Sequence, residues 1–366
     1  MNKIIKDELD LLSKPGDTIY ETLEYLQMSQ AELALRMGKT PSKINDLITG
    51  KEPITINTAM QLEKVLGIST QFWLNRESIY REKLARLEQE EFLEECIGWL
   101  KNQPVAELRK LGHLKADKIS TAMVDECLQF YGVSNPTQWE TIYVSQYATT
   151  SFRKNDNYTQ KLSSMAAWLR IGEIEIRKYN LKAYDKELFK VNLTNIRRLV
   201  KDHPEDFAEE LQRLCMEAGV GLIYSASISK APISGAVRWI GNNPVIQLTD
   251  RYKLNDLFWF AFFHEAGHVL LHGKKNIFIE NFTDYKADVN KEKEADEFAN
   301  KWLLPVDVTK EFTNGIDENE IKKVARKYST HPAIVLGRLQ YLKIVPYSFA
   351  ITLKAKIDLS RLINKM

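Results

Sequence analysis

The sequence is poor in cysteine, in long apolar runs and in net charge. Its three cysteines, Cys96, Cys127 and Cys215, form no C-x-x-C pair, which excludes both a disulfide framework and a thiolate zinc site. The longest apolar runs, such as residues 257–263, are far shorter than the ~20 residues that cross a bilayer. We therefore expect no transmembrane segment.

The charge is nearly balanced, with 51 basic residues against 49 acidic residues and a net charge of +2. A chain of this balance has no generally basic surface, so any contact with nucleic acid must come from a local patch. The first ten residues mix lysines with acidic residues and lack an apolar segment followed by small residues. We therefore expect no secretory signal and a cytoplasmic location.

The length of 366 residues is enough for two or three domains, and changes of pattern divide the chain into three parts. Residues 1–80 contain short helices with clear caps, and residues 81–204 continue as a helical connector without a chemical motif. Residues 205–366 mix strands with helices. We expect the first two parts to be mainly α and the third to be α+β.

The last part alternates turn residues with short β-branched or aromatic runs, which predicts a small antiparallel sheet. Strands are predicted at residues 220–224, 236–240, 245–248 and 277–280, with a strand-like segment at 347–353. Helices are predicted at residues 254–272, 291–304 and 318–328, and from Pro332 onward.

Two short helices near the N-terminus are marked by their capping residues. Ser29 and Glu32 form a capping box that opens a helix over residues 30–37, and Gly38 closes it. Thr40 then caps a second helix that begins at Pro41. With a further helix on each side, this pair predicts a helix-turn-helix, whose second helix can enter a major groove. The alternative is a helical dimerisation module with no DNA partner.

The charge of this pair differs from that of its surroundings. Residues 1–80 carry nine basic and eleven acidic residues, a net charge of −2. Within residues 36–51 the basic residues outnumber Asp46 by three, which makes phosphate binding plausible there. The basic residues are Arg36, Lys39, Lys43 and Lys51.

Residues 13–80 resemble the Cro/C1-type (XRE) helix-turn-helix family, and within it the HigA-type antitoxins. The matching segments are the Pro15-Gly16 pair, residues 28–34, residues 44–51 and residues 72–74. The resemblance implies that the recognition helix reads bases through Thr40, Ser42, Lys43 and Asn45, while Gln30 and Lys51 hold phosphates. It further implies operator DNA and a homodimer as partners. Asp46 departs from the pattern, because that position is commonly basic or neutral.

A second motif, His264-Glu265-Ala266-Gly267-His268, has the H-E-x-x-H spacing. Residues four apart share a helix face, so both imidazoles can reach one metal ion while Glu265 faces its bound water as the general base. The plainer alternative is a pair of hydrogen-bonded histidines on a core helix.

A zinc site of this type needs a third protein ligand. His272 lies eight residues from His264, about 12 Å along the helix at 1.5 Å per residue, so it cannot join both histidines. In the helix over residues 291–304, Glu292 falls near the apolar face, and we expect it to be the third ligand. Asp296, one turn later, is expected to accept a hydrogen bond from a ligating histidine.

Residues 205–345 resemble the ImmA/IrrE family of zinc metallopeptidases. The matching residues include Gly235, the 258–272 segment with its H-E-x-x-H motif, Glu292 and Pro305. The resemblance implies a zincin-like fold, Zn²⁺ held by His264, His268 and Glu292, and amide hydrolysis with Glu265 as base. Manganese or iron remains an alternative in a His₂Glu site. His331 either stabilises an oxyanion near this site or caps the following helix.

Together the motifs predict a DNA-binding regulator, or HigA-like antitoxin, fused to a zinc metallopeptidase. Such a chain would control a toxin–antitoxin or mobile-element operon and cleave a repressor or itself. Its partners would be operator DNA, a second copy, and an RNA-cleaving toxin or a repressor. The alternatives are a non-proteolytic repressor whose metal site is structural or senses an effector, and a general stress-response protease with a vestigial helix-turn-helix.

Overall fold

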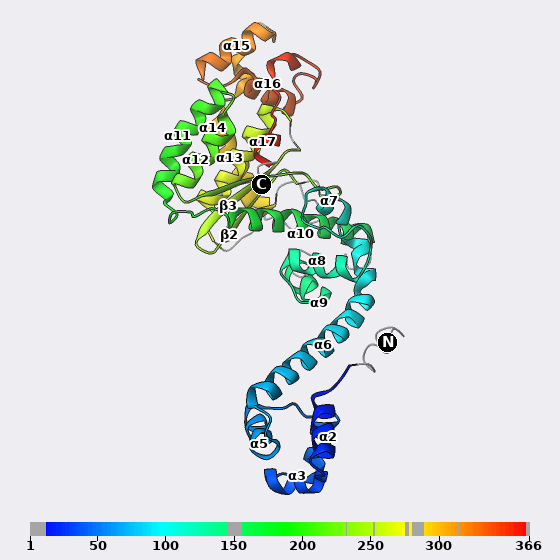
Figure 1. Cartoon of the computed structure of the whole chain (residues 1–366). Coiled ribbons are helices and arrows are strands. Elements are labelled where there is room, and N and C mark those ends of the chain that lie inside the picture. Colours follow the sequence, from blue (N-terminus) through cyan, green and yellow to red (C-terminus); the bar gives the residue numbers. More distant parts are fainter. Residues whose placement is uncertain are drawn as a thin grey trace. The chain divides into compact units, whose positions relative to one another are not determined.

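The computed structural model describes residues 12–144, 156–231, 233–251, 253–274, 278–279, 289–312 and 315–363. The chain divides into two compact units (Figure 1). The first comprises residues 1–98 and 116–125, and the second comprises residues 99–115 and 126–366. None of the helices within the described ranges is long and apolar enough to span a bilayer.

The first unit is built from short helices, and their ends follow the predicted caps. Ser29 accepts a hydrogen bond from the Glu32 amide, Thr40 accepts one from the Lys43 amide, and Gly38 is left-handed. The helices enclose a small core that contains the buried side chains of Ile19, Leu33, Ile44, Leu62 and Trp73. They are α2 (Pro15–Tyr25), α3 (Gln30–Met37), α4 (Pro41–Ile48), α5 (Ile56–Leu66) and α6 (Thr70–Cys96).

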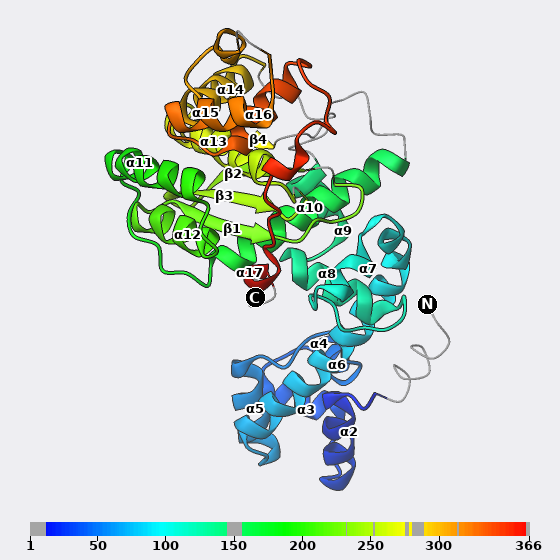
Figure 2. The same ribbon diagram turned by 90° about the horizontal axis from the view of Figure 1, so that it is seen from above.

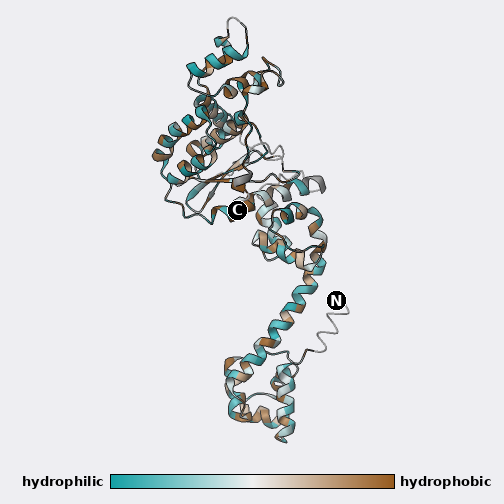
Figure 3. Ribbon diagram, turned by 45° about the horizontal axis from the view of Figure 1, so that its top comes forward, coloured by the Kyte–Doolittle hydropathy of each residue, from teal (hydrophilic) through white to brown (hydrophobic). Residues whose placement is uncertain are grey.

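The long helix α6 changes the division expected from the sequence. It runs unbroken for 27 residues, so the expected boundary at residue 80 lies inside a helix. Beyond Tyr80 its residues are mostly hydrophilic (Figure 3). The change of composition there marks where the helix leaves the small core, because Trp73 and Tyr80 are buried whereas the following residues are mostly solvent-exposed.

The second unit combines helices with one sheet. Its N-terminal elements are η1 (Ile97–Asn102), α7 (Val105–Lys110), α8 (Thr121–Tyr131), α9 (Pro136–Trp139), η2 (Glu140–Val144), α10 (Asp156–Ile176), α11 (Lys186–Asp202) and α12 (Phe207–Glu217); η1 and α8 begin in the first unit. The strands are β1 (Gly221–Ser225), β2 (Gly235–Ile240), β3 (Asn243–Thr249) and β4 (Phe278–Ile279). The remaining helices are α13 (Asn255–Leu271), α14 (Val289–Leu303), η3 (Val308–Glu311), α15 (Glu318–Lys327), α16 (Pro332–Tyr341), η4 (Ile351–Leu353) and α17 (Ser360–Ile363).

The sheet has the strand order β1-β3-β2-β4 (Figure 2). The α+β prediction is confirmed, but the prediction of a purely antiparallel sheet is wrong, because β1 pairs with β3 in parallel. Strands β1 and β2 are not adjacent in the sheet. Strand β3 follows β2 through a tight turn and lies between them. Since β2 runs opposite to β1, β3 must run parallel to β1.

Helices cover both faces of this sheet. Ile223 and Val245 point to α10 and cluster with Ile176, whereas Leu222 and Ile246 point to the core formed by α11, α12 and α13. This alternation follows from the two-residue period of a strand. Helix α10, which was expected to belong to a separate connector, is therefore part of the sheet domain.

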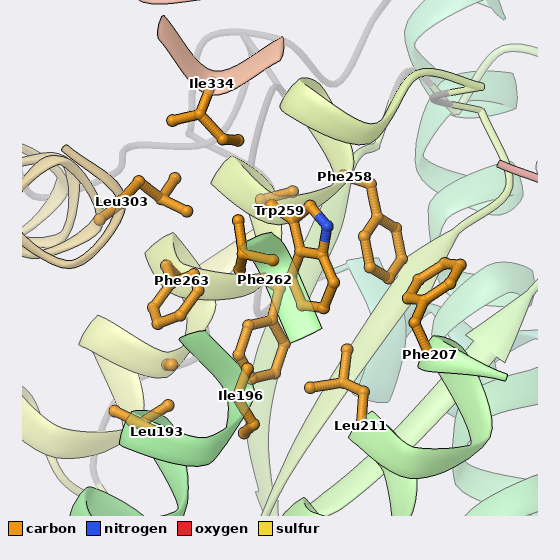
Figure 4. Packing of buried hydrophobic residues seen from close by; sticks show 14 of the residues in the cluster. Leu193, Ile196, Phe207, Leu211, Phe258, Trp259, Phe262, Phe263, Leu303 and Ile334 are labelled. Atoms are coloured by element: carbon orange, nitrogen blue, oxygen red, sulfur yellow. The ribbon is translucent and has the colours of Figure 1, made fainter. Parts of the chain in front are cut away.

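Helix α13 forms the centre of the larger core. Its aromatic side chains lie between residues of α11, α12, α14 and α16 (Figure 4). They are Phe258, Trp259, Phe262 and Phe263, all at most 2% exposed. Burial on nearly all sides holds α13 rigidly, which fixes the positions of the polar residues on its C-terminal half.

The segment at residues 347–353 is not a strand. It forms turns and the 3-10 helix η4, and Ala350 has a left-handed backbone with a φ of 48°. The Gln340 side chain donates a hydrogen bond to the Tyr347 carbonyl over 3.1 Å. The same nitrogen lies 3.4 Å from the Pro346 and Phe349 carbonyls.

Candidate functional sites

The first candidate site lies between helices α13 and α14. Gly267 allows these helices to approach closely, because a Cβ at this position would lie 3.3 Å from the Ala295 Cα and 3.2 Å from the Phe298 ring. A side chain at this position would require these neighbours in α14 to shift. The glycine of the H-E-x-x-H motif therefore brings the first turn of α14 opposite the two histidines.

Three predicted ligand residues converge there. The His264 Nε2 lies 3.0 Å from the His268 Nε2 and 3.1 Å from the Glu292 Oε2. The His268 Nε2 lies 3.6 Å from the same carboxylate oxygen. Ligand atoms of a tetrahedral zinc ion, with bonds of about 2.0–2.1 Å, are separated by about 3.3 Å. The spacing of the three atoms thus fits a single ion of this kind.

The charge states of the cluster also fit a divalent cation. Burial tends to raise the pKa of Glu292, but hydrogen bonds to His264 and His268 outweigh it and lower this pKa to about 2. Burial lowers the pKa of His268. A carboxylate and neutral imidazoles are the forms that bind metal. In the described part of the chain, the buried Glu292 Oε1 has no hydrogen-bond partner.

Both histidines are oriented through their other ring nitrogen. The His264 Nδ1 donates to the Asp296 Oδ1 over 2.9 Å, as expected from the sequence. The His268 Nδ1 lies 2.9 Å from the His272 Nδ1, and the His272 Nε2 donates to the Glu294 Oε2 over 2.9 Å. A proton held at Nδ1 leaves the Nε2 lone pair directed at the cluster.

The roles of His272 and Glu294 were not predicted from the sequence. His272 lies outside the group of three residues whose atoms could hold one ion, yet it contacts His268 from one turn further along the helix. The spacing of four residues between His268 and His272 was a sufficient signal for this contact.

Glu265 is fully buried and lies next to strand β2. A Cβ at Gly235 would lie 2.5 Å from the Glu265 Oε1. Any other residue at position 235 would therefore displace this carboxylate, which explains why a glycine begins the strand.

Removal of the Asp296 carboxylate should weaken metal binding. We expect Asp296→Ala to raise the dissociation constant for zinc by about tenfold, since loss of a ligand's outer hydrogen-bond partner costs about 10–100-fold and Asp296 is half-exposed. Competition with a chelating dye would measure the change. Glu297→Ala, on the exposed face of the same helix, is the control and should bind zinc as the wild type does. Equal affinities in the two variants would contradict this role.

His331 caps helix α16. Its Nδ1 accepts a hydrogen bond from the Ala333 amide over 3.1 Å, and the Asn255 side-chain nitrogen lies 3.3 Å from the same atom. The capping interpretation of this residue therefore agrees with the structure, and the residue does not belong to the group of three ligand atoms.

The second candidate site is the pair of helices α3 and α4 in the first unit. Ile44 and Leu47 face the core, so the opposite side of α4 faces the solvent. The residues expected to read bases, Thr40, Ser42, Lys43 and Asn45, are all exposed, as is Lys51, whereas Gln30 is half-buried. The exposed side of α4 thus carries Ser42, Lys43 and Asn45, with Thr40 at its N-cap.

Ion pairs reduce the local positive charge that the sequence suggested. Arg36 pairs with Glu32 at 2.6 Å, and Lys43 pairs with Glu52 at 3.4 Å. Among the residues described for this unit, Lys39 and Lys51 have no ion pair. Exposed pairs of this kind are weak, about 0–1 kcal/mol, so a phosphate can compete for Arg36 and Lys43.

Comparison with known proteins agrees with this arrangement. A model of the helix-turn-helix family matches residues 19–73. The uncharacterized HTH-type transcriptional regulator YddM of Escherichia coli (strain K12) is 40% identical over 67 residues, which are 18% of this chain and 71% of that protein. The chain belongs to the helix-turn-helix family.

This helix-turn-helix protein has further similarities. Virulence-associated protein I of Dichelobacter nodosus is 35% identical over 74 residues, 19% of this chain and 67% of that protein. An addiction module antidote protein of a HigA family from Coxiella burnetii has 29% identity over 23% of this chain and 92% of its own, with a TM-score of 0.22.

The second unit matches a different family. A model of peptidase family M78, described as the IrrE N-terminal-like domain, covers residues 215–340. This range contains the whole cluster of His264, His268 and Glu292. The helix-turn-helix protein therefore combines a DNA-binding domain with an IrrE-like domain.

Proposed function

We propose that this helix-turn-helix protein is a transcriptional regulator whose IrrE-like domain is a zinc-dependent peptidase. One observation carries the peptidase proposal: three ligand atoms from His264, His268 and Glu292 lie within 4.8 Å of one another. The neighbouring Glu265 supplies a carboxylate suited to general-base catalysis.

Each of these residues has a distinct proposed role in amide hydrolysis. His264, His268 and Glu292 would hold the ion, and Asp296 and His272 would orient the two imidazoles. Zinc, when bound, acidifies a water molecule and polarises a carbonyl. Glu265 accepts the proton of the attacking water and passes it to the nitrogen of the leaving amine. The buried site excludes bulk water and so strengthens these interactions.

Helix α4 is proposed to enter the major groove of operator DNA. A dimer would place two copies of this helix on half-sites about one helical turn apart. The regulated genes would belong to a toxin–antitoxin or mobile-element operon, with a toxin or a repressor as protein partner. The peptidase would then end repression by cleaving a repressor or the chain itself.

The peptidase proposal is tested by digestion of casein with the purified full-length protein, with and without bound zinc. Zinc-dependent appearance of peptides, measured by mass spectrometry, is expected. A zinc-loaded protein that leaves casein and helix-turn-helix repressors intact would instead favour the non-proteolytic repressor.

Loss of the Lys51 charge should weaken DNA binding and its dependence on salt. Each phosphate contact contributes about 0.9 to the slope of log K against log salt concentration, so Lys51→Ala should reduce the slope by about 1. Fluorescence anisotropy on duplex DNA from upstream of its own coding sequence would measure it. Lys64→Ala, an exposed lysine in α5, is the control. If the slope for Lys51→Ala equals that of the wild type, Lys51 does not contact a phosphate.

A further inference from the structure

A cavity of about 140 Å³ lies between helices α13, α14 and α16 of the second unit. Much of its wall is apolar and includes Phe260, Leu303 and Ile334; the last two are labelled in Figure 4. Leu257 and Tyr341 also line it and are 43% and 69% exposed. A small molecule can therefore enter past these two residues from the solvent.

A buried carboxylate makes this cavity more than a packing defect. Asp256, which lines it, is 6% exposed. Its Oδ2 accepts a hydrogen bond from the Lys354 Nζ over 2.6 Å, whereas its Oδ1, also buried, has no hydrogen-bond partner among the residues that the structure describes. An unpartnered buried acceptor is unfavourable. A donor brought by a ligand would relieve it.

The carboxylate is held in a fixed position. A Cβ at Gly337, which also lines the cavity, would lie 2.6 Å from the Asp256 Oδ2, so the glycine lets α16 close over this side chain. Lys354, itself 6% exposed, balances the charge of Asp256. A neutral donor is thus the better complement, because a cation would meet a carboxylate that is already paired, together with Arg338 in the cavity wall.

The cavity also borders the metal cluster. Asp296 lines the cavity and accepts the hydrogen bond of the His264 Nδ1. Phe260 lines it as well, and its ring centre lies 6.3 Å from that of His264. A molecule bound in the cavity would therefore touch Asp296 and Phe260, which both contact His264.

We propose that this cavity binds a compact, neutral aromatic molecule with one hydrogen-bond donor, and that its occupancy changes the affinity of the adjacent cluster for zinc. The apolar part of the wall would accept the ring, and the donor would pair with the Asp256 Oδ1. This assigns a ligand site to the domain that does not depend on peptide hydrolysis.

Two matched ligands test the site. Indole carries an N–H donor, and benzofuran has the same shape with an oxygen in its place. Isothermal titration calorimetry on the full-length, zinc-loaded protein should show indole binding about tenfold more tightly, the value of about one hydrogen bond to a charged acceptor. Equal affinities would overturn the role of Asp256, and no binding of either ligand would overturn the site.

Two cavity variants and one surface control test the location. Asn300→Phe fills the cavity from α14 and should lower indole affinity by at least about tenfold, whereas Lys301→Phe, on the exposed side of the same helix, should leave it unchanged. Leu257→Trp narrows the exposed rim and gives the same test if Asn300→Phe does not fold. Wild-type affinity in a folded cavity variant would place indole elsewhere and overturn the proposal.

A second titration tests the link to the metal cluster. The zinc dissociation constant should change by about fivefold or more under saturating indole, a coupling of ordinary size. An unchanged constant in a protein that binds indole would overturn the coupling. Because neither readout measures cleavage, an inactive peptidase would leave both results interpretable.

Discussion

Glu265→Gln is expected to lower the rate of casein hydrolysis by about 10²–10⁴-fold, the usual contribution of a general base. Glutamine has the shape of glutamate but cannot accept the proton of the attacking water. The substitution fits the fully buried position beside Gly235, where a larger side chain would not. Zinc content and melting temperature should stay near those of the wild type, as elemental analysis and calorimetry would measure.

The control separates the base from a general loss of acidic charge. Glu297→Gln removes a carboxylate from the exposed face of α14 and should cleave casein at the wild-type rate. If Glu265→Gln cleaves equally well, Glu265 is not the base. If Glu265→Gln loses cleavage but still represses its operon, the peptidase is not needed for repression.

His264→Ala is expected to reduce the zinc content from about one ion per chain to almost none. Of the three proposed ligands, His264 has the Nε2 that lies nearest to both other ligand atoms, at 3.0 and 3.1 Å. Loss of a direct ligand should weaken zinc binding by more than about 100-fold, the upper value for loss of a group that only hydrogen-bonds to a ligand. Elemental analysis after purification without chelators would measure the metal.

His113→Ala is the matched control for this substitution. His113 belongs to the same unit but lies outside the cluster, with its ring tilted against that of Phe130 at 5.2 Å between ring centres. It should keep the wild-type zinc content. Equal metal content in both variants would show that the ion binds elsewhere. A wild-type protein that contains no metal would contradict the zinc site and leave only the DNA-binding function.

Local signals in the sequence were sufficient for the first unit. A helix cap involves residues only three apart, so Ser29 with Glu32 and Thr40 with Lys43 specify two helix starts without knowledge of the rest of the chain. The H-E-x-x-H spacing likewise places His264 and His268 on one face by helix geometry alone. Even Glu292 followed from the apolar face of its own helix.

Contacts between segments that are distant in the sequence could not be predicted in the same way. The parallel pairing of β1 with β3 depends on the order in which strands fill the sheet, and the pattern of a strand does not name its neighbour. The same holds for α10, which covers one face of the sheet but was assigned from the sequence to a separate connector. Lys43 and Glu52 are nine residues apart, so their pairing and the resulting loss of local charge depend on how α4 meets the following loop.

The sequence by itself therefore determined the two chemical motifs and the helices that carry them, because each depends on neighbours within about one or two helix turns. Only the tertiary structure decided how the helices meet. Gly267 and Gly337 let α14 and α16 close onto α13, and that packing brings Asp296 to His264 and leaves Asp256 at a cavity. These close contacts between helices depend on packing between segments that are distant in the sequence. The periodicity of the sequence shows only which face of a helix is buried.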